Sequence, residues 1–169
     1  MRKILATMII ACAATFALSA CDQKDKTAAT QAEQAPQVAP MPTNATDKTA
    51  WKKYLVSVVT ANMTGVKTNH PYMYFVPSGD AQDVQDARQS QLDNVSGTVS
   101  RGVLPGNMLA FGGPDSKLTG DLVVEAFKSA GEGSFKGVIV LFVGAPADQD
   151  RVKAAVAKSG AEFRFVEMK

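Results

Sequence analysis

The sequence predicts an α/β fold: a single small domain of about four mostly parallel strands, with helices on both faces of the sheet and one N-terminal helix ahead of the first strand. Short apolar segments alternate along the chain with segments whose apolar residues recur at helical spacing. This alternation is typical of parallel strands that are joined by crossover helices. About 120 residues follow a long polar stretch near the start, and that length is enough for one hydrophobic core.

The first helix is predicted to begin near Trp51. Further apolar residues follow at the spacing of one helix face: Tyr54, Leu55, Val58, Val59 and Met63. Asp47 or Thr49 is suited to cap the start of this helix, and Gly65 is suited to end it. Because valine lowers helix propensity, a strand is the alternative for this segment.

Four short apolar segments are the strand candidates, at residues 72–76, 108–111, 138–143 and 162–167. The third is apolar on both faces, as expected for a central strand of a covered parallel sheet. The fourth alternates between apolar and polar residues, as expected for a half-exposed edge strand.

Helices are expected after the first three of these strands. Asp80 with Asp83 opens the first helix, Asp115 precedes the second, and a turn at Pro146 leads into the third. Residues 96–107 are rich in glycine and serine. They are predicted to form a long loop or to contain a short extra strand.

The first residues have the layout of a secretory signal. Arg2 and Lys3 precede an apolar run over residues 4–17, which is too short to span a bilayer as a helix. The run leads into Leu18-Ser19-Ala20-Cys21, which resembles the lipobox of bacterial lipoproteins. The resemblance implies cleavage before Cys21, a diacylglyceryl group on its thiol and an acylated amine, so that the lipid bilayer becomes a binding partner. An ordinary signal peptide with a nearby cysteine is the alternative.

Asp22 resembles the inner-membrane retention signal of enterobacterial lipoproteins. The resemblance implies a membrane-anchored lipoprotein that faces the periplasm, on the inner membrane rather than the outer membrane. Residues 22–48 are rich in Gln, Ala, Thr, Pro and Lys, a composition that cannot bury enough apolar surface to fold. The predicted organisation is therefore a signal peptide (1–20), a lipidated cysteine with a disordered tether (21–48), and an α/β globular domain (49–169).

Charge and cysteine content exclude several kinds of function. The leader contains two of the 18 basic residues and none of the 16 acidic residues. The mature chain is therefore balanced in charge and has no electrostatic basis for binding nucleic acid. Cys12 is lost with the leader and Cys21 is lipidated, which leaves no thiol for a disulfide, a redox role or a zinc site. No metal and no cofactor is predicted.

Four charged residues are the candidates for contact with a partner: Asp80, Arg101, Asp115 and Asp148. The three acids follow strands, and the strand ends of a parallel sheet meet at the edge where open α/β folds bind ligands. These acids are interpreted either as residues that cap helices or lie in their first turns, or as ligands of a hard cation such as Mg²⁺. Arg101 is placed in the predicted loop, where a charged side chain either contacts another protein or stays solvated.

No catalytic residue is predicted. His70 is the only histidine, no Gly-x-Ser-x-Gly elbow occurs, and residues 111–115 match neither the dinucleotide-binding glycine pattern nor a P-loop. A tethered domain of this kind is expected to bind another protein rather than to be an enzyme. Its layout is similar to that of periplasmic immunity lipoproteins, which implies a secreted cell-wall-degrading toxin as the partner. Two alternatives remain: a small-ligand- or cation-binding domain or enzyme at the carboxylate-lined edge, and a scaffold subunit of an envelope complex.

Overall fold

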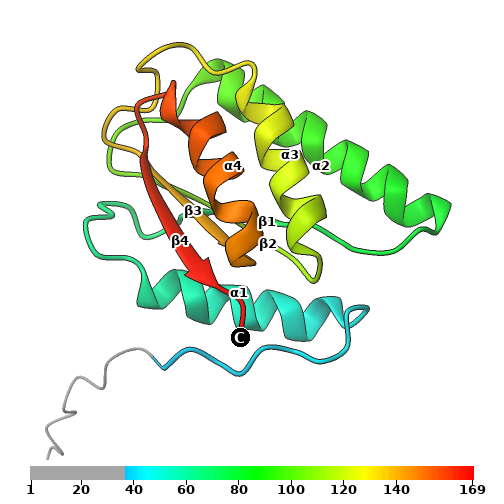
Figure 1. Cartoon of the computed structure of the whole chain (residues 1–169). Helices are drawn as coiled ribbons and strands as arrows, with labels where there is room; N and C mark the ends of the chain where they lie inside the picture. Colours follow the sequence, from blue (N-terminus) through cyan, green and yellow to red (C-terminus); the bar gives the residue numbers. More distant parts are fainter. Residues whose placement is uncertain (1–36) are drawn as a thin grey trace, which may run out of the picture. The chain divides into compact units, whose positions relative to one another are not determined.

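The computed structural model describes residues 37–169, which form four helices around one four-stranded sheet (Figure 1). The elements are α1 (Lys48–Ala61), β1 (Tyr72–Phe75), α2 (Gln82–Arg101), β2 (Met108–Gly112), α3 (Ser116–Phe127), β3 (Ile139–Gly144), α4 (Pro146–Ala157) and β4 (Glu162–Glu167). The predicted α/β fold is confirmed, including the helix ahead of the first strand. The predicted signal peptide, Cys21, Asp22 and the tether up to residue 36 lie outside the described residues.

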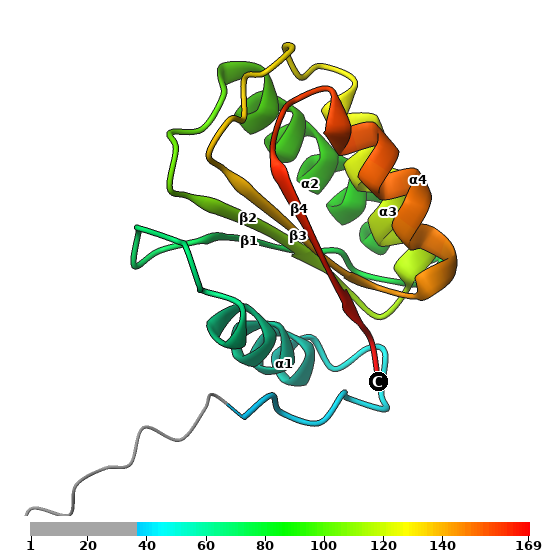
Figure 2. The ribbon, with the colours of Figure 1, turned by 60° about the vertical axis from the view of Figure 1, so that its left-hand side comes forward.

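All four strands are parallel, and their order in the sheet is β1-β2-β3-β4. Right-handed crossovers between sequential strands place their helices on the same face of a sheet. Figure 2 shows this arrangement, with α2, α3 and α4 on one face and α1 on the other. The strand order does not reverse within the described sheet. The sheet therefore lacks the switch point at which open α/β folds form a ligand crevice.

The two faces of the sheet bury two separate apolar cores, because alternate residues of a strand point to opposite faces. On the face covered by α2, α3 and α4, the buried strand residues include Leu109, Phe111, Val140 and Phe142. On the α1 face, they include Met108, Ala110, Ile139, Leu141 and Val143. Strand β3 is buried along its whole length, which confirms the prediction of a central strand.

Helix α1 begins close to the predicted position. The side chain of Asp47 accepts a hydrogen bond of 2.9 Å from a backbone N–H of the first turn and caps the helix. The segment just before the helix contacts it. The indole of Trp51 donates to the carbonyl of Asn44 at 3.1 Å, and the N–H of Ala39 donates to Oγ of Ser57 at 2.9 Å. Residues 37–46 contain no helix or strand.

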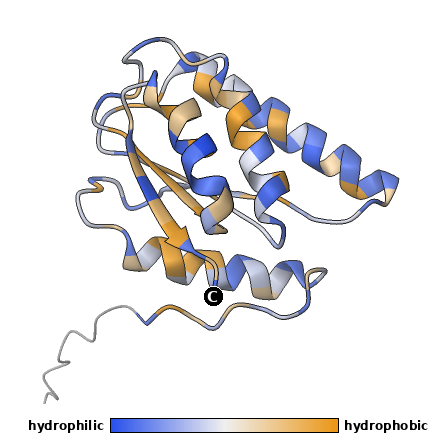
Figure 3. Cartoon of the chain, in the orientation of Figure 1, coloured by the Kyte–Doolittle hydropathy of each residue, from blue (hydrophilic) through white to orange (hydrophobic). Residues whose placement is uncertain are grey.

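Helix α2 is longer than the sequence predicts. Residues 96–101 form its last turns and residues 102–107 form a short loop, so the prediction of a long loop or an extra strand over this whole stretch is wrong. Val95, Thr98 and Val99 are buried at helical spacing. Their burial outweighs the weak helix propensity of the glycine and serines around them. The first half of α2 is mainly hydrophilic (Figure 3) and largely exposed.

The two outer strands of the sheet are β1 and β4. Strand β4 has half-exposed side chains, which confirms the prediction of an edge strand. None of the helices within residues 37–169 combines the length and the apolar composition needed to cross a bilayer.

Candidate functional site

The three acids that the sequence places at the strand-end edge lie there, each shortly after its strand. Asp80 is exposed between β1 and α2, Asp115 directly precedes α3, and Asp148 lies in the first turn of α4. Each carboxylate has different surroundings, and two of the three are engaged by other parts of the fold.

Asp115 caps helix α3. Its Oδ1 accepts a hydrogen bond of 2.9 Å from the N–H of Leu118, as the helix-cap interpretation requires. Asp80 does not cap α2, because Ala81 occupies the N-cap position without a side-chain hydrogen bond. The backbone carbonyl of Asp80 accepts a hydrogen bond of 2.7 Å from the Gln85 side chain.

Asp148 is held by two side chains. The hydroxyl of Ser116 donates a short hydrogen bond to Oδ2 of Asp148, and Nε of Arg151 donates to Oδ1 at 2.9 Å. The Ser116 oxygen also accepts a hydrogen bond of 2.7 Å from the N–H of Ala145. These bonds join the starts of α3 and α4, and they engage both carboxylate oxygens of Asp148 within the fold.

Arg151 extends this connection along α3. Its Nη1 donates to Oδ1 of Asp121 at 2.8 Å, and its Nη2 donates to the carbonyl of Lys117 at 2.9 Å. Partial burial alone would raise the pKa of Asp121, but the hydrogen bond from Lys117 and the charge of Arg151 outweigh it and lower that pKa. The guanidinium fits because Gly120 lacks a side chain, since a Cβ there would lie 2.5 Å from Nη2.

Close packing explains the glycine pair at the end of β2. A Cβ on Gly112 would lie 2.4 Å from a methyl group of Leu55 in α1, and a Cβ on Gly113 would lie 2.0 Å from the carbonyl oxygen of Val76. Neither glycine has a positive φ. The pair therefore allows α1 and the end of β1 to approach β2, and this accounts for Gly112-Gly113 by packing.

Arg101 lies at the other end of the molecule from the three acids. It is the last residue of α2, which has 20 residues, so the two ends of this helix are about 30 Å apart. The prediction that Arg101 lies in a loop is therefore wrong. In the loop that follows, Leu104 is 77% exposed. The four residues predicted to contact a partner do not form one surface.

A surface that the sequence analysis did not identify lies between α1 and the edge strand β1. Met73 and Val56 are each 46% exposed. Three adjoining hollows, with volumes of about 300, 360 and 220 Å³, have Met73 in common. The third hollow is lined by Lys52, Leu55, Val56, Met73 and Phe75. These three hollows together are called the β1–α1 groove below.

The β1–α1 groove exists because one helix covers this face of the sheet. Strands lie about 4.8 Å apart, so the outer strands of a four-stranded sheet are separated by roughly 14 Å, whereas a helix is about 10 Å across. The core beneath α1 is formed mainly by β2 and β3. Met73 and Phe75 of β1 are consequently left at the border of the covered area.

The sequence contains a partial signal for this groove. Every position from residue 72 to residue 76 is aromatic or aliphatic, and such a strand is normally covered on both faces. On the α2 face, Tyr74 follows this expectation, because it is buried and its ring stacks on Phe111 with 5.1 Å between centroids, whereas Tyr72 at the start of the strand is 44% exposed. The α1 face does not, because β1 is an edge strand, and strand order is not visible in a local pattern.

A further hollow, of about 380 Å³, lies between α2 and α3. Its lining combines polar and charged side chains with three leucines and consists of Gln85, Arg88, Gln89, Leu92, Leu118, Asp121, Leu122 and Glu125. Arg88 donates hydrogen bonds of 3.1 Å and 2.8 Å to the carbonyls of Pro77 and Gly79. It therefore fixes the loop between β1 and α2.

Among residues 37–169, no group of three or more His, Cys, Asp and Glu side chains is placed to hold a metal ion. Comparison of the chain with protein-family models, with curated proteins and with solved structures found no match. A function for this chain therefore has to be argued from its own residues and their geometry.

Proposed function

We propose that this chain is a membrane-anchored lipoprotein that faces the periplasm and binds another protein there. The proposed location is supported by the resemblance of Leu18-Ser19-Ala20-Cys21 to a lipobox, with acylated Cys21 as the anchor in the lipid bilayer. Asp22 favours the inner membrane over the outer membrane. Several acyl chains hold a protein firmly, whereas one chain gives marginal binding.

The observation that carries the binding function is the exposed apolar surface of the β1–α1 groove. Met73 and Val56 lie on adjacent elements and are both about half exposed, and Lys52 and Thr60 border them. A contiguous apolar surface with a polar rim marks a site of interaction more often than scattered apolar residues do. This surface supports a binding role.

The partner we propose is a secreted cell-wall-degrading toxin, with this chain as its immunity protein. The similarity of layout to periplasmic immunity lipoproteins supports this choice. Asp80 and Arg101 are exposed and remain candidate contacts at opposite ends of α2. Asp115 and Asp148 are less accessible candidates, because each carboxylate already has partners within the fold.

The anchor is tested by fractionation of a Cys21→Ser variant in the bacterium that makes the protein. Wild type is expected in the membrane fraction, and the variant is expected in the soluble periplasmic fraction. Mass spectrometry of the wild-type amino terminus is expected to find acylated Cys21. Membrane fractionation of Cys21→Ser like that of wild type would contradict the proposed location.

Protein binding is tested by crosslinking in the same cells and purification of the tagged full chain. We expect a secreted hydrolase to be enriched, and we expect the purified chain to inhibit the cell-wall-degrading activity of that hydrolase. Enrichment of a hydrolase that is not inhibited would contradict the immunity role. Recovery of a stable multiprotein envelope complex would favour the scaffold alternative.

A further inference from the structure

We infer that the β1–α1 groove binds an extended segment of the partner protein, which adds to the outer edge of β1 as a further strand and places an acidic side chain near Lys48 and Lys52. This inference rests on the proposed protein-binding function. It adds the location of the binding surface and the chemistry of the segment that the surface recognises.

The first support is the backbone of β1, whose outer edge faces no other described strand. The N–H of Val76 donates to the carbonyl of Gly112 at 2.9 Å, so the backbone groups of Val76 and Tyr74 face β2. Because N–H and C=O groups alternate in direction along a strand, those of Met73 and Phe75 point outward. An added strand can form hydrogen bonds with both residues.

The second support is the position of the side chains. Met73 and Phe75 line the β1–α1 groove opposite Val56, so the residues with outward-pointing backbone groups are also the ones that form its apolar floor. Alternate side chains of a strand point to the same face. A segment paired with β1 therefore fills the hollows with two apolar side chains that are two positions apart, and its main chain supplies the hydrogen bonds.

The third support is charge. Lys48 and Lys52 line the end of the groove near Pro77, and no Asp or Glu lines any of its three hollows. Neither lysine forms an ion pair with a described residue. Asp47, which precedes Lys48, is used as the cap of α1. A carboxylate on the bound segment would complement this charge.

A second copy of this chain fits the groove less well. Two-fold symmetry would pair the two β1 strands antiparallel, so the Phe75 end of one strand would face the Tyr72 end of the other. The residues before Tyr72 are Asn69, His70 and Pro71, and none of them is acidic. The charge of Lys48 and Lys52 would stay unmatched in such a dimer, so a segment of another protein is favoured.

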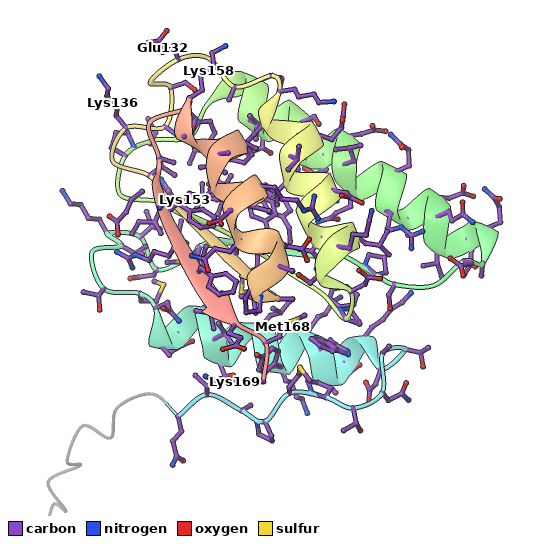
Figure 4. The ribbon with its side chains drawn as sticks, in the orientation of Figure 1. Glu132, Lys136, Lys153, Lys158, Met168 and Lys169 are labelled. Carbon is purple, nitrogen blue, oxygen red and sulfur yellow. The ribbon has the colours of Figure 1, made fainter. Side chains whose placement is uncertain are left out.

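The experiment places a photocrosslinking amino acid in the full chain at Thr60 or Gln91, which line the two outer hollows of the groove. The control position is Lys153, which is exposed on α4 (Figure 4), the helix that packs on β3 and β4 and not on β1. Adducts formed in cells are mapped by mass spectrometry. We expect adducts from Thr60 and Gln91 on one segment that contains an acid and two apolar residues two positions apart, and no adduct from Lys153.

A synthetic peptide of the mapped segment then tests the two contacts. Met73→Pro removes the outward N–H at a position where an edge strand tolerates proline, and Met73→Ala is its control, because it removes the side chain but keeps the N–H. We expect Met73→Pro to weaken peptide binding about tenfold more than Met73→Ala does. Circular dichroism shows whether both variants keep the fold.

Charge reversal at Lys52 of α1 tests the contact with the acidic side chain independently of the backbone pairing. Lys52→Glu is expected to weaken peptide binding about tenfold. A peptide in which the acid is replaced by lysine is expected to bind the Lys52→Glu variant with the lost affinity restored. Lys153→Glu is the matched control and is expected to leave the affinity unchanged. Equal binding of the original peptide to wild type and Lys52→Glu would overturn the inference.

The crosslinking outcomes separate this inference from the proposed function. Adducts to a partner protein from Lys153 and not from the groove positions would overturn the groove but leave protein binding intact. Adducts from the groove positions to a second copy of the chain would overturn the inference that the groove binds a segment of another protein. Absence of adducts at all three positions, together with no protein recovered by crosslinking of the tagged chain, would overturn both.

Discussion

The backbone carbonyl of Asn62 accepts a hydrogen bond of 2.8 Å from Nη1 of Arg164, which joins the end of α1 to the edge strand β4. Asn62 is the C-cap of α1, so the guanidinium also faces the negative end of the helix dipole. Met168 packs into the core beneath α1, and Figure 4 shows Met168 and Lys169 beside this helix. These contacts join the end of α1 to β4 and to the residues that follow it, while Met73 of β1, at the opposite edge of the sheet, stays about half exposed.

Replacement of Arg164 tests this link. We expect Arg164→Met to lower the free energy of unfolding by about 1–2 kcal/mol, because the Asn62 carbonyl loses a charged donor while the apolar stem of the side chain is kept. Lys169→Met is the control, because the Lys169–Glu167 ion pair is long at 3.5 Å and exposed. We expect this variant to change the free energy of unfolding little. Urea denaturation measures both. Equal midpoints for the two variants would show that the Arg164 bond does not stabilise the fold.

Gly113 tests the close approach of β1 to β2. Gly113→Ala is expected to cost about 3 kcal/mol, because the added Cβ would lie 2.0 Å from a backbone oxygen of Val76 that cannot move without shifting the strand end. Gly131→Ala is a matched control, since its nearest neighbour would be 3.6 Å away. Thermal unfolding compares the two variants. Similar midpoints for both would argue against close packing as the reason for glycine at position 113.

Gly120 and Arg151 are expected to be coupled. Gly120→Ala alone should destabilise the protein by about 1–2 kcal/mol, because its Cβ would lie 2.5 Å from Nη2 of Arg151. In an Arg151→Ala background the same substitution should cost less, because the guanidinium is gone and alanine favours a helix more than glycine does, although the Cβ would still lie 3.2 Å from a methyl group of Val152. A double-mutant cycle by urea denaturation measures this coupling. Simple additivity of the two changes would contradict it.

Tyr74 is expected to make stability fall at high pH. Burial raises the pKa of its phenol, and this effect outweighs the hydrogen bond with Thr98, which lowers the pKa. The folded state therefore favours the neutral phenol, and the resulting stability is complete below the unfolded pKa of about 10. It is lost as the pH rises through the raised pKa.

Tyr74→Phe should therefore lose less stability above pH of about 10 than wild type does. Part of the loss should remain, because burial also raises the pKa of Tyr54, outweighing a backbone hydrogen bond with Lys169. Tyr72→Phe removes a phenol that is 44% exposed and should have a smaller effect, because Tyr72 raises the pKa of Tyr74 less than burial does. Urea midpoints across the alkaline range measure the effect. Parallel curves for wild type and Tyr74→Phe would contradict the prediction.

The cation alternative makes the opposite prediction to the helix-cap interpretation. With Asp115 engaged as a cap and Asp148 paired with Arg151, we expect millimolar Mg²⁺ or Ca²⁺ to leave the thermal midpoint unchanged. A native-state ligand would raise that midpoint. An increase that disappears in Asp115→Asn and Asp148→Asn would favour a cation site at the strand-end edge instead.

The alternation of strands and helices could be predicted from the sequence, because that alternation depends on the spacing of apolar residues a few positions apart. The sequence also indicated Asp47, as one of two candidates, and Asp115 as caps, since a cap depends on the side chain just before the first helical turn, but its candidate Asp80 does not cap α2. Strand β3 was recognisable as central because all of its residues are apolar. These properties are local, and local patterns are sufficient to predict them.

Tertiary structure alone decided which strand is the uncovered edge and which residues share a surface. Burial of Val95 and Val99 extends α2 to Arg101 and moves that residue away from the three acids. Met73 is exposed because one helix is narrower than the sheet that it covers. The width of the sheet cannot be predicted from the sequence of β1. Contacts between residues far apart in the chain depend on strand order and crossover handedness, which no short segment encodes.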